Sequence, residues 1–170
     1  MAKKISLREF QASLAQRLAS AQRGGEQRAM LGLQAGEEFW VIDLADSGEI
    51  LPVPPITSVP ITKPWYLGLA NIRGSLWSVV DFAAFQGGDR VAQSGESRIL
   101  LPHARFGINS ALLVRRALGL RNPDDFEPAA GTEDARPWVG ECLRDLQGRT
   151  WRRLKLRELF AEDRFLDVTA

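Results

Sequence analysis

One stretch, from Trp65 to Phe82, constrains the fold of this chain more than any other. It reads WYLGLANIRGSLWSVVDF: an apolar segment interrupted by Gly68, a polar corner, and then an alternating run without proline. That last run is rich in β-branched and aromatic residues, which is typical of a buried strand. Gly74, directly before it, supplies a positive φ or lets another backbone approach closely. We therefore expect a tight corner leading into a central strand.

Arg73 lies at this corner, and we expect its guanidinium to be free to leave the surface. A guanidinium is a planar fork of five donors, so a rigid corner is a good place to present it to a partner. Asn-x-Arg-Gly is also a common turn composition, however, and most arginines in turns are merely solvated. The residues alone leave both interpretations open, because function is argued from a site and not from a turn.

The totals indicate an ordinary globular protein. The chain has 170 residues, enough for one sizeable core or two small intertwined ones. A formal net charge of +1 gives no general attraction for nucleic acid or a membrane. The single cysteine, Cys142, cannot form an internal disulfide, which favours a reducing compartment. No signal-peptide hydrophobic region follows Met1, and no apolar run approaches the roughly 18–20 residues that span a bilayer. We expect a cytoplasmic protein.

Residues 5–22 are predicted to form an amphipathic helix. Ser6 and Glu9 make a capping box, and apolar residues repeat at steps of three and four. The stripe packs on the protein's own body, binds a partner or self-associates; the mixed charge of the polar face disfavours a membrane surface. The apolar positions are Leu7, Phe10, Leu14, Leu18 and Ala21.

The remaining pattern indicates an all-β barrel or sandwich. We assign residues 1–36 to the helix and a linker, 37–165 to the folded domain and 166–170 to a tail that is loose from residue 167. Gly107 suggests a bulge or a close approach inside a strand, and a short helix begins at Arg157. About eight or nine short strands are expected, among them 38–44, 49–53, 75–82, 97–101, 106–114 with a continuation over 115–121, 138–146 and 149–156.

A segment between the second expected strand and Gly68 is unusually rich in proline. Residues 52–64 hold five of the nine prolines, so the backbone there is extended and short of donors. We expect an ordered surface connection, because apolar residues between the prolines look like anchors to the body. A polyproline ligand for another module is the sharper alternative.

The sequence offers little for catalysis. His103 is the only histidine and lies on an expected turn, without cysteine or histidine at ligand spacing, so no metal site is predicted. No nucleophile elbow and no phosphate-binding loop are present. Asp124 and Asp125 lack the register of a calcium site. We therefore expect neither an enzyme nor a bound cofactor.

The closing hairpin carries a basic cluster, which raises an alternative function. Basic residues interleaved with an aromatic residue on a small barrel are typical of a surface for single-stranded nucleic acid, whereas the plain interpretation is a solvated strand face that protects an edge. Strict alternation places Trp151 opposite Leu154, so either a bulge intervenes or Trp151 packs outside the main core. The basic residues are Arg144, Arg149, Arg152, Arg153, Lys155 and Arg157.

The stretch from Trp65 to Phe82 also resembles the signature of the CheW-like domain family. That signature has a glycine, two or three further residues, Asn-(Leu/Ile)-Arg-Gly, and a strand that ends in Asp-(Leu/Phe). The resemblance implies two interlocked, five-stranded SH3-like barrels that share a core, to which the N-terminal helix and a short C-terminal helix are added. The matching positions are Gly68, Asn71, Ile72, Arg73, Gly74, Asp81 and Phe82.

The resemblance further implies a non-enzymatic adaptor. Members bridge the cytoplasmic tip of a methyl-accepting chemoreceptor and the regulatory domain of a CheA-like histidine kinase, and the helix and the proline-rich pattern here more closely resemble the variant of type IV pilus chemosensory systems, which serve twitching motility. By their match to the family signature, Asn71, Arg73 and Gly74 are expected to face the receptor, and Gly68 is expected to support the backbone. The resemblance places the receptor tip in the groove between the barrels and the kinase domain end to end on one barrel. Kinase-binding residues are not assigned, and self-association in arrays is left open.

Overall fold

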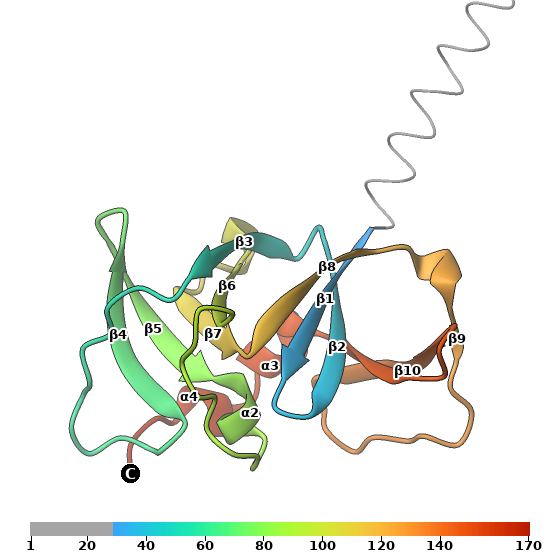
Figure 1. The fold of residues 1–170 in the computed structure, drawn as a ribbon. Helices are drawn as coiled ribbons and strands as arrows, with labels where there is room; N and C mark the ends of the chain where they lie inside the picture. Colours follow the sequence, from blue (N-terminus) through green and yellow to red (C-terminus); the bar gives the residue numbers. More distant parts are fainter. Residues whose placement is uncertain (1–28) are drawn as a thin grey trace, which may run out of the picture.

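The computed structural model describes residues 29–170, and these residues form two β-sheets with short helices between them (Figure 1). The helix expected over residues 5–22 lies outside the described residues. The chain enters one sheet with two strands, builds the whole of the other sheet, and then returns to complete the first. Because the first two and the last four strands of the described chain belong to the same sheet, no linker separates the two halves.

The first sheet has six strands within the described residues, in the order β8-β1-β2-β11-β10-β9. Neighbours are antiparallel except β2 and β11, which run parallel where the chain returns. Gly32 in β1 makes room for a large side chain, since a Cβ there would stand 3.2 Å from the ring of Trp151. The strands are β1 (Met30–Ala35), β2 (Glu38–Asp43), β8 (Arg116–Arg121), β9 (Phe126–Pro128), β10 (Val139–Asp145) and β11 (Thr150–Leu154).

The second sheet has five strands in the described part of the chain, in the order β3-β6-β7-β5-β4. Here the parallel pair is β5 and β7. The strands are β3 (Ser47–Pro52), β4 (Tyr66–Ile72), β5 (Ser75–Asp81), β6 (Arg98–Pro102) and β7 (Ser110–Val114). Three α-helical turns and two 3-10 turns complete the described fold: α2 (Phe82–Phe85), α3 (Leu156–Phe160), α4 (Asp163–Leu166), η1 (Ala104–Phe106) and η2 (Pro123–Asp125).

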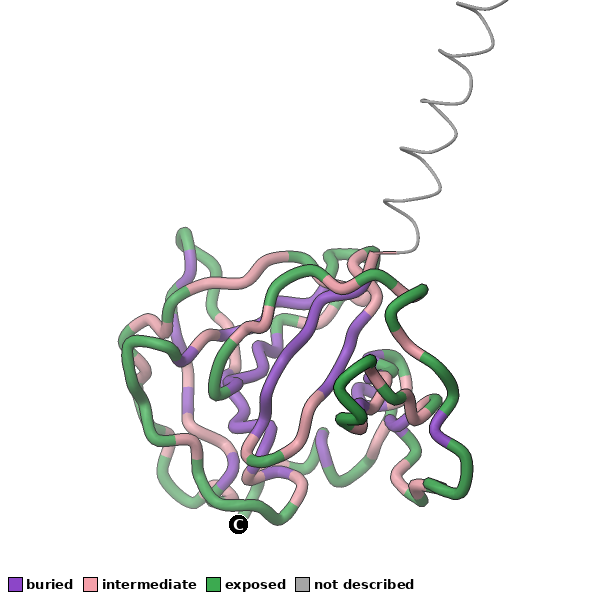
Figure 2. The backbone as a smooth tube through the Cα atoms, turned by 45° about the vertical axis from the view of Figure 1, so that its right-hand side comes forward, coloured by how far each residue is buried: buried purple, intermediate pink, exposed green. Residues whose placement is uncertain are grey.

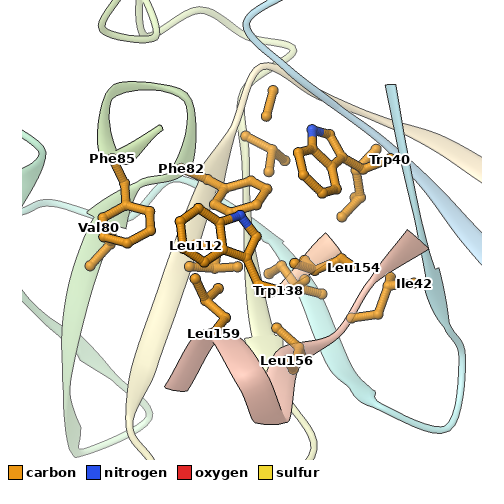
Figure 3. Close-up of a cluster of buried hydrophobic side chains, with 14 of the residues drawn as sticks. Trp40, Ile42, Val80, Phe82, Phe85, Leu112, Trp138, Leu154, Leu156 and Leu159 are labelled. Carbon is orange, nitrogen blue, oxygen red and sulfur yellow. The ribbon is translucent and has the colours of Figure 1, made fainter. Parts of the chain in front are cut away.

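The central strands are buried on both faces, so alternate residues enter different cores. In β7, Leu112 and Val114 belong to a large central cluster, whereas Ala111 and Leu113 belong to a smaller cluster of the five-stranded sheet. The central cluster draws residues from both sheets and from α2, α3 and α4. Figure 3 shows members from both sheets, from α2 and from α3. Buried stretches accordingly run through the middle of the fold, and exposed stretches form the connections around it (Figure 2). The shared core expected from the family resemblance is confirmed.

Trp151 does pack outside the central core, one of the two outcomes foreseen. It is fully buried in a third, small cluster of the six-stranded sheet, and the register of β10 and β11 shifts between Val139 and Cys142. Its indole N–H donates to Asp145 at 2.8 Å, and the guanidinium of Arg121 lies 5.1 Å from its ring centroid. Each sheet thus has a core of its own in addition to the shared one.

Three expectations about local structure are wrong. Residues 30–35, expected within a linker, form the buried strand β1. The tail is not loose from residue 167, because Thr169 bridges to Thr62 and the amide of Lys63 donates to the Val168 carbonyl at 2.9 Å. Gly107 is not a bulge within a strand; its φ of 64° ends the short turn η1, where an L side chain would be strained.

Candidate partner-binding site at the Arg73 corner

The corner before β5 is a two-residue hairpin loop. Ile72 pairs with Ser75, which leaves Arg73 and Gly74 as the loop. Both have positive φ, 52° and 83°, as a type I′ turn requires, and this turn matches the twist of the two strands. The amide N–H of Gly74 donates to Oδ1 of Asn71 at 2.9 Å, which closes the corner. Asn and Gly therefore have structural reasons to stand here, and Arg73 is displayed between them.

The guanidinium of Arg73 is not free, contrary to expectation. Its Nη1 and Nη2 donate to the two carboxylate oxygens of Glu49 in β3, at 2.7 and 2.5 Å. The side chains stay 69% and 38% exposed, so the pair stands in solvent. The hydrogen bonds from Arg73 lower the pKa of Glu49, and the bonds from Glu49 raise the pKa of Arg73. Glu49 is a candidate site residue that the sequence did not reveal, since a pairing across 24 positions has no local signature.

A hollow of about 420 Å³ lies beside this pair. Its apolar lining includes Trp77, Leu101 and Ile108, and Arg73 and Glu49 line it as well. Trp77 is half-buried and lines the hollow, whereas Val79, two residues further along β5, is fully buried. The corner thus combines a bidentate cation with an adjoining apolar recess.

Gly68 has a different structural role from Asn71, Arg73 and Gly74, the other residues assigned from the family signature. It does not line the hollow, and its φ of 131° is a conformation that L side chains rarely adopt. The proline-rich segment crosses β4 at this point, where Thr57 and Leu69 exchange two backbone hydrogen bonds of 2.8 Å. The absence of a side chain at Gly68 therefore admits the crossing segment.

The junction between the two sheets holds other residues. Two hollows of about 260 and 370 Å³ lie there, and neither is lined by Asn71, Arg73, Gly74 or Gly68. These two hollows share no lining residue with the Arg73 hollow, although the short turn η1 contributes both to that hollow and to the smaller of the two.

A charged network that the sequence did not predict spans this junction. Arg136 donates to Asp134 at 2.8 and 2.6 Å and to both carboxylate oxygens of Glu38 at 3.0 Å. It also donates to Oε1 of Gln86, which follows α2, at 2.5 Å. The Arg136 hydrogen bonds hold the pKa of Asp134 far below its ordinary value, and those of Asp134 raise the pKa of Arg136. Asp134 is a poor sequence candidate because it stands in a loop of plain acidic composition.

The basic hairpin lacks the arrangement that nucleic-acid stacking needs. Trp151 is 0% exposed, so no base could stack on its ring. Arg152 pairs with Asp134 at 3.0 Å, and Arg153 pairs with Asp43 at 2.7 Å. Cations already engaged with acids are less available to phosphates.

No group of three or more His, Cys, Asp or Glu side chains among residues 29–170 is arranged to hold a metal ion. No helix in the same range is long and apolar enough to cross a membrane. The ring of His103 serves the backbone instead, because its Nδ1 accepts the amide N–H of Arg105 at 3.1 Å.

The comparisons agree with this architecture. The model of the CheW-like domain family matches residues 29–164, so the chain belongs to the CheW-like domain family. Among curated proteins it is similar to Protein PilI from Pseudomonas aeruginosa, with 28% identity over 109 residues. That match covers 64% of this chain and 61% of PilI, so it spans less than two thirds of the relative. The crystal structure of the scaffolding protein TtCheW from Thermoanaerobacter tengcongensis superimposes with a TM-score of 0.67 at 22% identity, covering 81% of this chain and 94% of that one.

Proposed function

We propose that this protein is a non-enzymatic adaptor that couples a methyl-accepting chemoreceptor to a CheA-like histidine kinase in a type IV pilus chemosensory system. The observation that carries the proposal is the central cluster shared by both sheets. An adaptor needs two separate surfaces on one rigid body, and two sheets joined through one core supply such a body. Membership of the CheW-like family and the similarity to PilI support the choice of partners.

The adaptor works by joining partners without new chemistry. Once one partner is bound, the other meets its site at a high effective concentration. A receptor signal reaches the kinase only if the two partners bias the same conformational equilibrium of the complex. The close packing of a shared core favours such coupling, because packed interiors transmit strain between the elements that they join.

The receptor side is proposed to include Asn71, Arg73 and Gly74. These residues stand at the exposed tip of the β4–β5 hairpin, and the apolar hollow lies beside them. Gly68 acts indirectly, by keeping the proline-rich segment in place over β4. The kinase is proposed to bind elsewhere on the barrels, and its contact residues are left unassigned.

The direct experiment is titration of the full chain against two fragments: the regulatory domain of the kinase and the cytoplasmic tip of a receptor from the same organism. We expect both to bind. Arg73→Glu should weaken the binding of the receptor fragment and leave the binding of the kinase domain unaffected. The melting temperature of the protein is checked in parallel. If neither fragment binds the wild-type chain, the adaptor function is wrong.

A further inference from the structure

We propose that Arg73 and Glu49 form an exchangeable pair, in which a carboxylate of the partner displaces Glu49 from the Arg73 guanidinium while a neighbouring apolar side chain enters the adjoining hollow. This inference rests on the proposed function, because the partner is taken to be the receptor tip. It adds the chemistry of recognition: an acidic residue beside an apolar one.

The internal carboxylate shows what the Arg73 fork accepts. Both oxygens of Glu49 are bound, at 2.7 and 2.5 Å, which is the planar bidentate arrangement that any carboxylate can adopt. The pair is exposed to solvent and joins two surface side chains, and such ion pairs contribute little to stability. An incoming carboxylate can therefore replace Glu49 at small cost, after which Glu49 returns to water.

The backbone at the corner indicates that the arginine side chain itself is needed. Arg73 has a φ of 52°, in the left-handed region that glycine and asparagine occupy with less strain. Only one other non-glycine residue of the described chain, Ile61, has a positive φ. A strained position occupied by a long cationic side chain points to a role for that side chain, since observed strain is a guide to functional sites.

The hollow supplies the second half of the recognition. The apolar side chains that line the hollow are close to the Arg73 guanidinium, because Arg73 and Glu49 line the same hollow. These apolar residues are Trp77, Leu101 and Ile108. A cationic fork beside an apolar recess is complementary to a segment with a carboxylate and an apolar side chain on one face, as amphipathic helices present.

The test compares four forms of the full chain in calorimetric titrations against the receptor tip fragment: wild type, Glu49→Gln, Arg73→Gln and the charge swap Arg73→Glu with Glu49→Arg. Exchange predicts effects of opposite sign. Glu49→Gln frees the fork and tightens binding about threefold or more, whereas Arg73→Gln weakens binding about tenfold. The charge swap rebuilds the internal pair but does not restore binding, unless the receptor carboxylate is replaced by lysine. Asp167→Asn, which breaks the exposed pair with Lys63, is the matched control and should change nothing.

The contrary results are equally specific. Glu49→Gln and Arg73→Gln could both weaken the binding of the receptor fragment while the charge swap restores wild-type binding. In that case the pair is a structural brace and the exchange is wrong, while the adaptor function stands. If the wild-type chain does not bind the receptor fragment at all, the adaptor function fails and the exchange fails with it. Melting curves of every variant exclude an effect of unfolding.

Discussion

The backbone of Thr57 crosses directly over the α-carbon of Gly68, so that a Cβ at residue 68 would stand 2.7 Å from the carbonyl carbon of Thr57. Backbone atoms cannot yield as a flexible side chain does, and the φ of 131° adds strain for any L residue. Gly74 forms a natural comparison: its φ is 83°, but nothing lies within 4 Å of its Cβ position. The two glycines of the family signature are therefore required for different reasons.

We predict that Gly68→Ala lowers the free energy of unfolding by about 2–4 kcal/mol, through overpacking and backbone strain together. Gly74→Ala should cost only about 1 kcal/mol, because it adds strain without a clash. Urea unfolding followed by circular dichroism measures both. Equal losses at the two positions would show that the close crossing at Thr57 relaxes freely.

The end of the chain is predicted to hold the proline-rich segment in place. Deletion of residues 167–170 removes the acceptor of the Lys63 amide, the Val168 carbonyl, and the bridge between Thr62 and Thr169. Amide hydrogen exchange at Lys63 should then accelerate by at least an order of magnitude. The amide of Ser78, which donates to the Asn109 carbonyl at 2.9 Å away from this segment, is the internal control and should keep its protection. Unchanged exchange at Lys63 would contradict this role of the tail.

Stability is predicted to depend on pH through Asp134. The hydrogen bonds from Arg136 depress the pKa of this carboxyl far below its ordinary value of 3.8. A carboxyl group whose pKa is depressed in the folded state stabilises the fold while it is ionised. Its contribution to the free energy of unfolding is therefore complete above about pH 5, which lies above the pKa of the unfolded state. That contribution is lost as the pH drops below about 4. Asp134→Asn should remove about 2 kcal/mol at pH 7 and flatten the acid limb of the profile. The measurement is the unfolding free energy between pH 7 and pH 2.5.

The control for that profile is the neighbouring exposed residue Glu133. Glu133→Gln should leave both the stability at pH 7 and the steepness of the acid limb nearly unchanged. An acid limb that is as steep in Asp134→Asn as in the wild type would mean that other carboxyl groups govern acid unfolding.

We predict that Trp151 contributes to the stability of the fold and not to the binding of a ligand. Its side chain fills the small core of the six-stranded sheet beside Met30 and Val41, so Trp151→Ala should cost about 3–5 kcal/mol. Trp77 lies at the half-buried lining of the Arg73 hollow, so Trp77→Ala should lower the unfolding free energy clearly less. It should instead weaken the binding of the receptor fragment. If Trp151→Ala left stability intact and abolished binding of a single-stranded oligonucleotide, the nucleic-acid alternative would regain its support.

The sequence predicted the fold class and most strands because hydrophobic alternation is a local signal. Strand β1 was missed for a physical reason: Gly32 and Gln34 make MLGLQA look like a linker. In the fold, Gly32 leaves room for the ring of Trp151, and the buried Gln34 accepts a hydrogen bond from Arg116 at 2.8 Å. Both explanations depend on strands far along the chain, so no pattern within the segment could reveal them.

The candidate site was predictable only in part. The residues Asn71, Arg73 and Gly74 stand out as a corner, and the structure explains that corner as a two-residue turn. The partner of Arg73 was not predictable, because Glu49 belongs to a strand whose sequence carries no sign of the pairing. The same holds for two of the partners of Arg136, because Glu38 and Gln86 lie 98 and 50 positions away, whereas Asp134 is only two residues before it.

The most direct test of the adaptor function is a kinase assay with three components. Autophosphorylation of the CheA-like kinase is measured with receptor-containing membranes, in the presence and absence of this protein, and with Arg73→Glu as the binding-deficient comparison. We predict that kinase activity responds to the receptor only when the wild-type protein is present, and that Arg73→Glu largely removes the response. A kinase that responds to the receptor equally well without this protein would contradict the coupling function.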